Sequence, residues 1–186
     1  LLETGEEIPR IINWEDPKWV KFQRKREEWL AEFASLLVST AKKVNPDITV
    51  VLQNAHWSNG WRDGLTLPFF EAQDYISGDF YGGALEQSFV CKLFYSLTPN
   101  KPFEYMTSRC PTLLDHTTMK SKELLEAQMY SVLANNGAFC FIDAIDPEGT
   151  LNRDFYVRMG ELFQEMEKYE KYLDHSSKFC QDVGIY

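Results

Sequence analysis

Residues 138–143 read AFCFID, an apolar run of strand length that ends in a carboxylate. Three similar runs precede it along the chain: VVLQN at 50–54, YISGDFY at 75–81 and FEYM at 103–106. Segments with helical periodicity separate the four runs. Strands that alternate with helices are typical of a parallel α/β sheet, which places functional side chains at the carboxyl ends of its strands.

The helices between these runs have recognisable ends. Asp16 followed by Pro17 predicts a helix start, and Pro46 predicts that this long helix stops near Asn45. Asn152 is the expected cap of the last helix. Apolar residues at helical spacing predict the other helical segments near 68–73, 84–95, 121–135 and 152–169.

The order α-(βα)₄ predicts an α/β fold that is the C-terminal half of a (β/α)₈ TIM barrel, with about four βα units and parallel strands. A complete barrel needs about 250 residues, and this chain has 186. We therefore expect residues 1–15 to be a linker from an upstream part of the protein. Residues 16–175 are expected to form the half barrel, and residues 176–186 to begin a following segment.

Composition narrows the classes of partner. The net charge of −9 argues against nucleic acid, and the absence of a long apolar run argues against a membrane partner. The four cysteines are widely spaced, so we expect no metal site and no cofactor. A neutral substrate fits this charge better, while composition leaves the compartment unassigned.

Two strand-end carboxylates are the candidates for chemistry. Glycoside cleavage needs two carboxyl groups, one protonated and one ionised. Asp79 stands among Gly78, Phe80 and Tyr81, so it is either a general acid or a solvated capping residue. Glu104 alternates with its apolar neighbours and is expected to point inward.

Residues near these carboxylates are candidates for binding a sugar. Glu104 is either catalytic or one half of a buried ion pair with Arg109 or Lys101. Asp143 is expected either to orient Arg109 or a substrate hydroxyl, or to cap the following turn. The other candidate substrate-binding residues combine aromatic faces with hydrogen-bonding groups: Asn54, His56, Trp57, Trp61 and Tyr81.

Four motifs resemble, in order, the last two βα units of α-L-fucosidase-type barrels, glycoside hydrolase family 29. They are PFEYMT at 102–107, the helix that opens at Lys120 and Ser121, NNGAF at 135–139 and PEGTL at 147–151. The similarity covers about residues 46–173. It is closest to a poorly characterised bacterial branch of hypothetical glycosyl hydrolases.

The resemblance implies roles for particular positions. Asn54, His56 and Trp57 resemble the substrate-binding segment after the fifth strand, Asp79 the acid/base carboxylate, and Glu104 the seventh-strand glutamate. The acid is often Glu in that family, so Glu86 is a fallback acid, and the last strand ends in Asp143 where that family usually has Asn. The nucleophile in that family is an aspartate after the fourth strand, upstream of residue 1.

These observations lead to a functional expectation with two alternatives. The resemblance implies a fragment of a retaining hydrolase of O-glycosidic bonds, inactive alone, whose partners are an oligosaccharide or glycoside substrate and the upstream half of the same barrel. A non-catalytic carbohydrate-binding remnant of such a barrel is the first alternative. An independent flavodoxin-like domain is the second, although no phosphate-binding loop follows the first expected strand.

Overall fold

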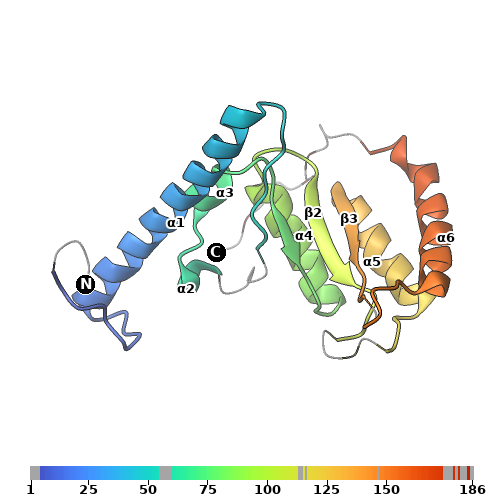
Figure 1. Ribbon diagram of the computed structural model, residues 1–186, viewed down its shortest axis with the longest axis horizontal. Helices are drawn as coiled ribbons and strands as arrows, with labels where there is room; N and C mark the ends of the chain where they lie inside the picture. The colour runs from blue at the N-terminus through green and yellow to red at the C-terminus, as the bar shows by residue number, and fades with distance from the viewer. Residues whose placement is uncertain are drawn as a thin grey trace.

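The computed structural model describes residues 5–54, 60–112, 115, 117–145, 147–173, 178, 180 and 184. Within them the chain is mixed α/β, and it begins with the long helix α1 (Pro17–Val44) (Figure 1). Three strands follow in order, β1 (Ser77–Asp79), β2 (Phe103–Ser108) and β3 (Gly137–Ile142). The other helices are α2 (Gly60–Asp63), α3 (Leu67–Glu71), α4 (Ala84–Leu97), α5 (Lys122–Ala134) and α6 (Arg153–Glu170).

Local capping chemistry fixes the ends of several helices. The Asp16 side chain accepts a hydrogen bond from the Lys18 amide at 2.9 Å, and Pro17 occupies the first turn. Asn152 likewise accepts from the Phe155 amide at 3.0 Å. Each cap satisfies an amide that the first turn leaves without a helical partner. The predicted starts of α1 and α6 are confirmed.

The three strands form one parallel sheet in the order β1-β2-β3. Ser77 is aligned with Glu104, and Glu104 is aligned with Ala138 on the other side. Helices α4 and α5 connect successive strands and lie together on one side of the sheet (Figure 1). A parallel sheet with crossover helices is therefore confirmed, with three strands in the described part of the chain rather than four.

The first expected strand is the exception. Residues 50–54 run beside β1, with the Asp74 amide donating to Val50 O at 3.0 Å and the Asn54 amide donating to Ser77 O at 2.9 Å. The amide of Leu52, however, donates to the Gln73 side chain at 2.7 Å. Side chains thus replace part of a backbone ladder, so the prediction of a regular strand here is wrong although its position beside β1 is right.

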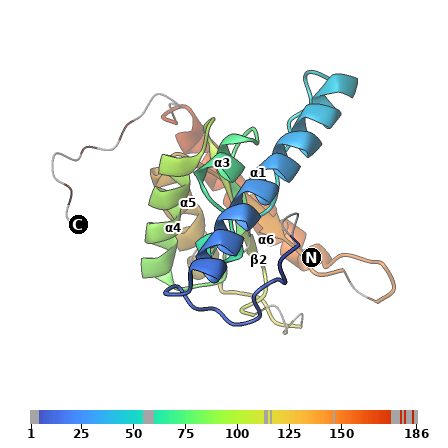
Figure 2. The same cartoon turned by 90° about the vertical axis from the view of Figure 1, so that its left-hand side faces the viewer.

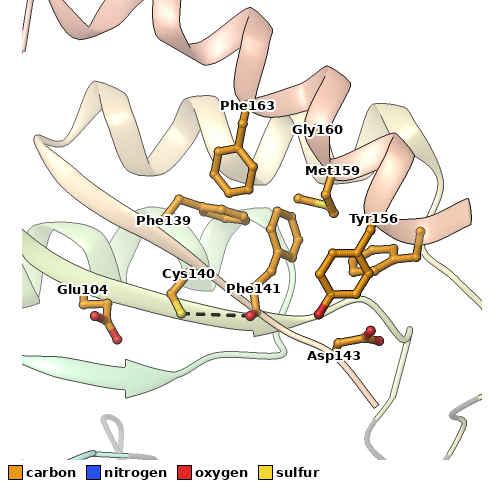
Figure 3. Close-up of a pocket in the computed structure, with 10 residues that line it drawn as sticks. Glu104, Phe139, Cys140, Phe141, Asp143, Tyr156, Met159, Gly160 and Phe163 are labelled. Atoms are coloured by element: carbon orange, nitrogen blue, oxygen red, sulfur yellow. Dashed lines mark hydrogen bonds between the residues drawn. The ribbon is translucent and has the colours of Figure 1, made fainter. Parts of the chain in front are cut away.

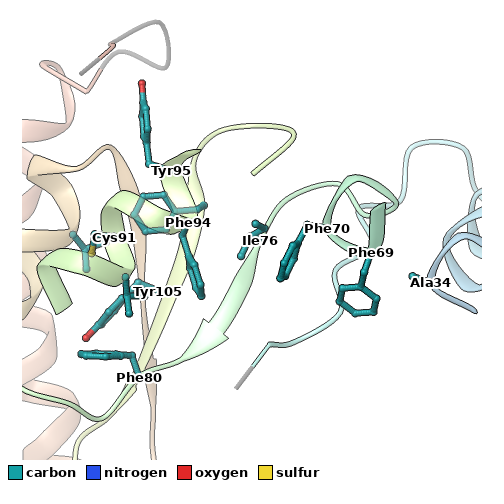
Figure 4. Close-up of a cluster of buried hydrophobic side chains, with 12 residues drawn as sticks. Ala34, Phe69, Phe70, Ile76, Phe80, Cys91, Phe94, Tyr95 and Tyr105 are labelled. Carbon is teal, nitrogen blue, oxygen red and sulfur yellow. The ribbon is translucent and has the colours of Figure 1, made fainter. Parts of the chain in front are cut away.

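Strand alternation builds the core on the helical side of the sheet. Phe103 and Tyr105 of β2 are fully buried and point to the same side as Phe94 of α4, whose ring meets Phe103 edge to face at 6.1 Å. Figure 4 shows this cluster extending through Ile76 towards α3. Burial of each such ring contributes roughly 2–3 kcal/mol.

The opposite face of the sheet is only partly covered. Glu104 and Met106 of β2 alternate with the buried Phe103 and Tyr105, and they remain half-buried. Cys140 of β3 is aligned with Met106 and is also half-buried. We call this the open face. It consists of Ser77, Asp79, Glu104, Met106, Ala138 and Cys140. Parallel sheets are normally covered on both faces, so this face is available for further packing or for a ligand.

In the described part of the chain, no helix is both long and apolar enough to cross a membrane.

Candidate functional site

Asp79 ends β1 on the open face, and both of its carboxylate oxygens accept hydrogen bonds. The Gln53 amide donates to Oδ1, and the Tyr81 hydroxyl donates to Oδ2 at 3.1 Å. Gln53 comes from the extended segment beside β1, while Tyr81 lies two residues beyond Asp79. Two uncharged donors therefore fix the carboxylate at the carboxyl end of the sheet.

The Tyr81 hydroxyl is held in its protonated form. Burial raises the pKa of Tyr81 to about 12, and the adjacent Asp79 charge and hydrogen bond act in the same direction. At neutral pH this phenol is consequently a stable hydrogen-bond donor to Asp79. The predicted substrate-binding residue Tyr81 thus contacts the predicted acid directly.

Glu104 lies on the same face but near the amino end of β2, whereas Asp79 lies at the carboxyl end of β1. It accepts a hydrogen bond from the Ser77 hydroxyl at 3.0 Å and another from the Tyr75 hydroxyl at 3.3 Å. The two cations expected to pair with Glu104 do not form an ion pair with it. Arg109 pairs with Asp143, and Lys101 lies over the Tyr95 ring. The expectation that Glu104 points away from Phe103 and Tyr105 is confirmed, whereas its partners are hydroxyls.

The Cys140 thiol on β3 is influenced by the charges of both carboxylates. Burial raises the pKa of the Cys140 thiol, and the charges of Glu104 and Asp79 raise it further. Both carboxylates are therefore close enough to act on one thiol on the neighbouring strand. Figure 3 shows Glu104 and Cys140 on adjacent strands of the open face. The thiol is accordingly a poor nucleophile and forms an uncharged part of the wall.

Arg109 and Asp143 form a buried ion pair across the carboxyl ends of β2 and β3. Arg109 Nε donates to Asp143 Oδ1, and the side chains are 3% and 9% exposed. The same oxygen accepts from the Ala144 amide at 2.7 Å, while Asp143 Oδ2 is buried with no hydrogen-bond partner in the described part of the chain. Asp143 thus both orients Arg109 and caps the following backbone, which makes the pair a brace between two strands.

Two cavities meet at Glu104. One, of about 600 Å³, lies between β3 and α6 (Figure 3). The other, of about 460 Å³, includes Tyr75 and Lys101 near the amino ends of the strands. The first cavity has mainly aromatic walls and includes two of the predicted site carboxylates, those of Glu104 and Asp143. Its lining residues are Glu104, Phe139, Cys140, Phe141, Asp143, Phe155, Tyr156, Met159, Gly160 and Phe163. Aromatic walls with a few polar groups suit a ligand with apolar and hydroxylated surfaces.

Other predicted residues are placed elsewhere. Asn54 is buried and lines a separate cavity of about 340 Å³ that also contains Trp61 and residues of α4. Glu86, in the first turn of α4, places a carboxylate oxygen against Gly82 just beyond β1. Glu86 is therefore at the same end of the sheet as Asp79. His56 and Trp57 lie outside the described residues.

The sequence interpretation missed two groups that contact the carboxylates. Gln53 reaches Asp79, whereas the sequence pattern points to its neighbour Asn54; alternation along the extended segment 50–54 places these two side chains on opposite sides. Ser77 reaches Glu104 because the two residues are aligned across β1 and β2. The alternation was readable from the sequence, but the register was not.

No family model, no curated protein and no solved structure matches this chain.

Proposed function

We propose that this chain is part of a glycoside hydrolase built on a parallel β/α barrel. The observation that carries the proposal is the pair of carboxylates on one face of a parallel sheet, Asp79 from β1 and Glu104 from β2. Glycosidic bond cleavage uses two carboxyl groups around one anomeric carbon. The larger cavity beside Glu104, which also reaches Asp143 just beyond the carboxyl end of β3, provides space for a sugar.

The barrel part of the proposal is supported by what the sheet leaves uncovered. Residues 50–54 and the three strands run in one direction, and in the part of the chain that the structure describes helices cover one face of the sheet. In a closed barrel, the open face would become the packed interior. The proposal assigns the other four βα units of the barrel to an upstream part of the same polypeptide, which also supplies the nucleophile that the family resemblance implies.

The roles of the residues follow from their positions. Asp79 would protonate the leaving oxygen and then activate water, with Gln53 and Tyr81 holding its carboxyl group. Glu104 would bind a sugar hydroxyl or stabilise positive charge at the anomeric centre. Glu86 is the second candidate acid because it lies at the same end of the sheet.

Hydrolysis of glycosides by the longer polypeptide that contains the upstream βα units tests these roles. We expect Asp79→Asn to slow hydrolysis of glycosides with poor leaving groups far more than that of activated aryl glycosides, with azide restoring the aryl rate. Glu161→Gln, on the exposed surface of α6, is the matched control and should change neither rate. Unchanged turnover by Asp79→Asn together with loss in Glu86→Gln would transfer the acid role to Glu86.

A non-catalytic sugar-binding protein is the second candidate. The observation that favours it is the set of uncharged donors, Gln53, Tyr81, Ser77 and Tyr75, which hold both carboxylates as acceptors. Such groups are suited to hydroxyl recognition. Sugar binding by the longer polypeptide without turnover of any aryl glycoside would support this candidate over the hydrolase.

A further inference from the structure

Two half-exposed tryptophans from distant parts of the chain meet at the surface. Trp14 precedes α1 and is 44% exposed, while Trp61 belongs to α2 and is 49% exposed. Their ring centroids are 5.5 Å apart and their planes are tilted by 38°. Together they present an aromatic surface that neither segment provides alone.

Hydrogen bonds between α1 and α2 hold this surface in place. Gln23 of α1 is 1% exposed and donates to the Trp61 carbonyl oxygen at 2.9 Å. Arg26 donates both to Gln23 Oε1, at 2.7 Å, and to the Arg62 carbonyl oxygen. These contacts attach α2 to α1 and fix Trp61 beside Trp14. A surface that is ordered before binding loses little conformational entropy when a ligand arrives.

Trp14 is supported separately by the ring of Trp19. Trp19 is buried and meets Trp14 edge to face, with ring centroids 6.3 Å apart and planes at 88°. The orientation of Trp14 is thus set by the core side of α1, while its other surface remains exposed.

Arg62 adds hydrogen-bond donors to the aromatic surface, because its guanidinium lies over the Trp61 ring. Its guanidinium carbon lies 5.1 Å from the Trp61 ring centroid. The guanidinium has no carboxylate partner in the part of the chain that the structure describes. An arginine offers five N–H donors, and those of Arg62 are consequently available for hydroxyl oxygens of a ligand.

The aromatic surface also lies at the functional end of the molecule. Helix α2 and the amino-terminal end of α1 are at the same end as the loops that leave β2 and β3 (Figure 1). The turned view in Figure 2 agrees, with the start of α1 and these loops both low in the picture. Active sites of parallel α/β folds occupy this end.

We propose that Trp14, Trp61 and Arg62 form a second sugar-binding subsite, which binds a neutral sugar unit of the oligosaccharide away from the bond that Asp79 acts on. This inference rests on the proposed function. Sugar rings carry C–H groups on their faces and hydroxyls at their edges. The two indoles match the faces, and the Arg62 donors match the edges.

The test is affinity electrophoresis of the full chain in gels that contain xyloglucan, arabinoxylan, galactomannan or laminarin. We expect at least one to retard the chain. Trp14→Ala and Trp61→Ala should each weaken this binding by roughly tenfold, and Arg62→Ala by several-fold. Tyr172→Ala is the matched control, since Tyr172 is an exposed ring with the Lys171 ammonium 4.9 Å from its centroid. It should bind like the wild-type chain.

The outcomes separate this inference from the proposed function. Retardation that Asp79→Asn retains and the tryptophan variants lose supports the subsite whether or not the protein is an enzyme. Equal retardation of wild-type and tryptophan variants, with loss in Glu104→Gln, overturns the subsite and leaves the proposed function standing. Absence of retardation by all four polysaccharides also overturns it. The subsite is likewise overturned if the wild-type chain self-associates and the tryptophan variants do not, because the aromatic surface would then bind a second copy of the chain. Arg62 is exposed, so Arg62→Ala remains informative if a tryptophan variant fails to fold.

Discussion

Gln53 donates a hydrogen bond to the carboxylate of Asp79 and thereby joins the extended segment 50–54 to the end of β1. The second oxygen of Asp79 accepts from Tyr81. The position of the central carboxylate therefore depends on a segment outside the regular sheet and on a loop residue. A substitution at Asp79 should therefore change a measurable property of its hydrogen-bonding neighbours, and a substitution at a neighbour should affect Asp79.

The first prediction concerns the ionisation of Tyr81. Asp79→Asn should lower the pKa of Tyr81 from about 12, because the negative charge and the accepting carboxylate both disappear. Burial is the larger cause and remains, so the pKa should stay above its ordinary value of 10. Alkaline titration followed by phenolate absorbance measures the change, with Tyr81→Phe assigning the signal. An identical titration curve for Asp79→Asn and wild type would contradict the contact.

The same shift predicts a stability window. A raised folded-state pKa means that protonated Tyr81 stabilises the folded chain below pH 10, and that this contribution is lost between pH 10 and about 12. The free energy of unfolding of the wild type should therefore fall more steeply across this interval than that of Tyr81→Phe. Denaturant unfolding at several alkaline pH values measures both slopes. Parallel curves would show that Tyr81 is not perturbed in this way.

The second prediction concerns a close backbone approach at Gly78. A Cβ on Gly78 would lie 2.1 Å from the Asn54 carbonyl oxygen, so segment 50–54 would have to move. We expect Gly78→Ala to destabilise the chain by more than about 2 kcal/mol. Gly160→Ala is the matched control, because Gly160 is in α6 and an added Cβ meets nothing within 4 Å. That variant should be stabilised by roughly 0.5–1 kcal/mol, the helical preference of alanine over glycine. Equal effects in denaturant unfolding would contradict the close approach.

The parts of the fold that could be predicted are those that local chemistry decides. The starts of α1 and α6 follow from Asp16 and Asn152, whose caps involve residues two or three positions away. The parallel connection of β2 to β3 follows from the helix between them. Segment 50–54 has a strand-like sequence, but Gln73 and Asp74 take amides that a regular ladder would use. That competition comes from residues about twenty positions away and has no local signature.

The sequence predicts which strands carry the candidate site residues. It predicts less well which residues form hydrogen bonds or ion pairs with them. Asp79 and Glu104 were identified from their positions in apolar runs. The partner of Glu104 depends on the register that aligns it with Ser77, which the sequence does not contain. The sequence allows Arg109 to pair with either Glu104 or Asp143, and the alignment of the carboxyl ends of β2 and β3 favours Asp143.

The third prediction concerns the Arg109 and Asp143 brace. Because both side chains are buried, Asp143→Leu or Arg109→Met alone should cost about 3–5 kcal/mol by removing one half of a buried ion pair and leaving the opposite charge in place. The double variant should cost clearly less than the sum of the two, since it leaves no buried charge. Denaturant unfolding of the four proteins completes the cycle. Additive costs would show that the two charges are not coupled. Lys168 and Glu165 form an exposed pair that serves as the control, and their coupling should be much weaker because solvent screens the two charges.

The fourth prediction concerns Lys120, a lysine buried between the sheet and the helices. Lys120 is 5% exposed, and its ammonium donates to the Thr107 hydroxyl at 2.8 Å and to Gln128 Oε1 at 3.5 Å. Neither partner is charged, so removal from water dominates and lowers the pKa of Lys120 to about 8 from an ordinary value of 10.5. The folded chain therefore holds fewer protons than the unfolded chain between these two values.

The sign of the pH dependence follows from that difference in bound protons. Below about pH 8 both states carry the charge and the folded chain bears the full desolvation cost, which disappears as the pH rises to 10.5. Relative to Lys120→Met, the wild type should gain about 3 kcal/mol in the free energy of unfolding across this interval, at about 1.4 kcal/mol per unit of pKa shift. Taking the difference between the two proteins removes the titration of cysteines and tyrosines in the same range. A constant difference between wild type and Lys120→Met across this interval would mean that Lys120 is solvated in the folded chain.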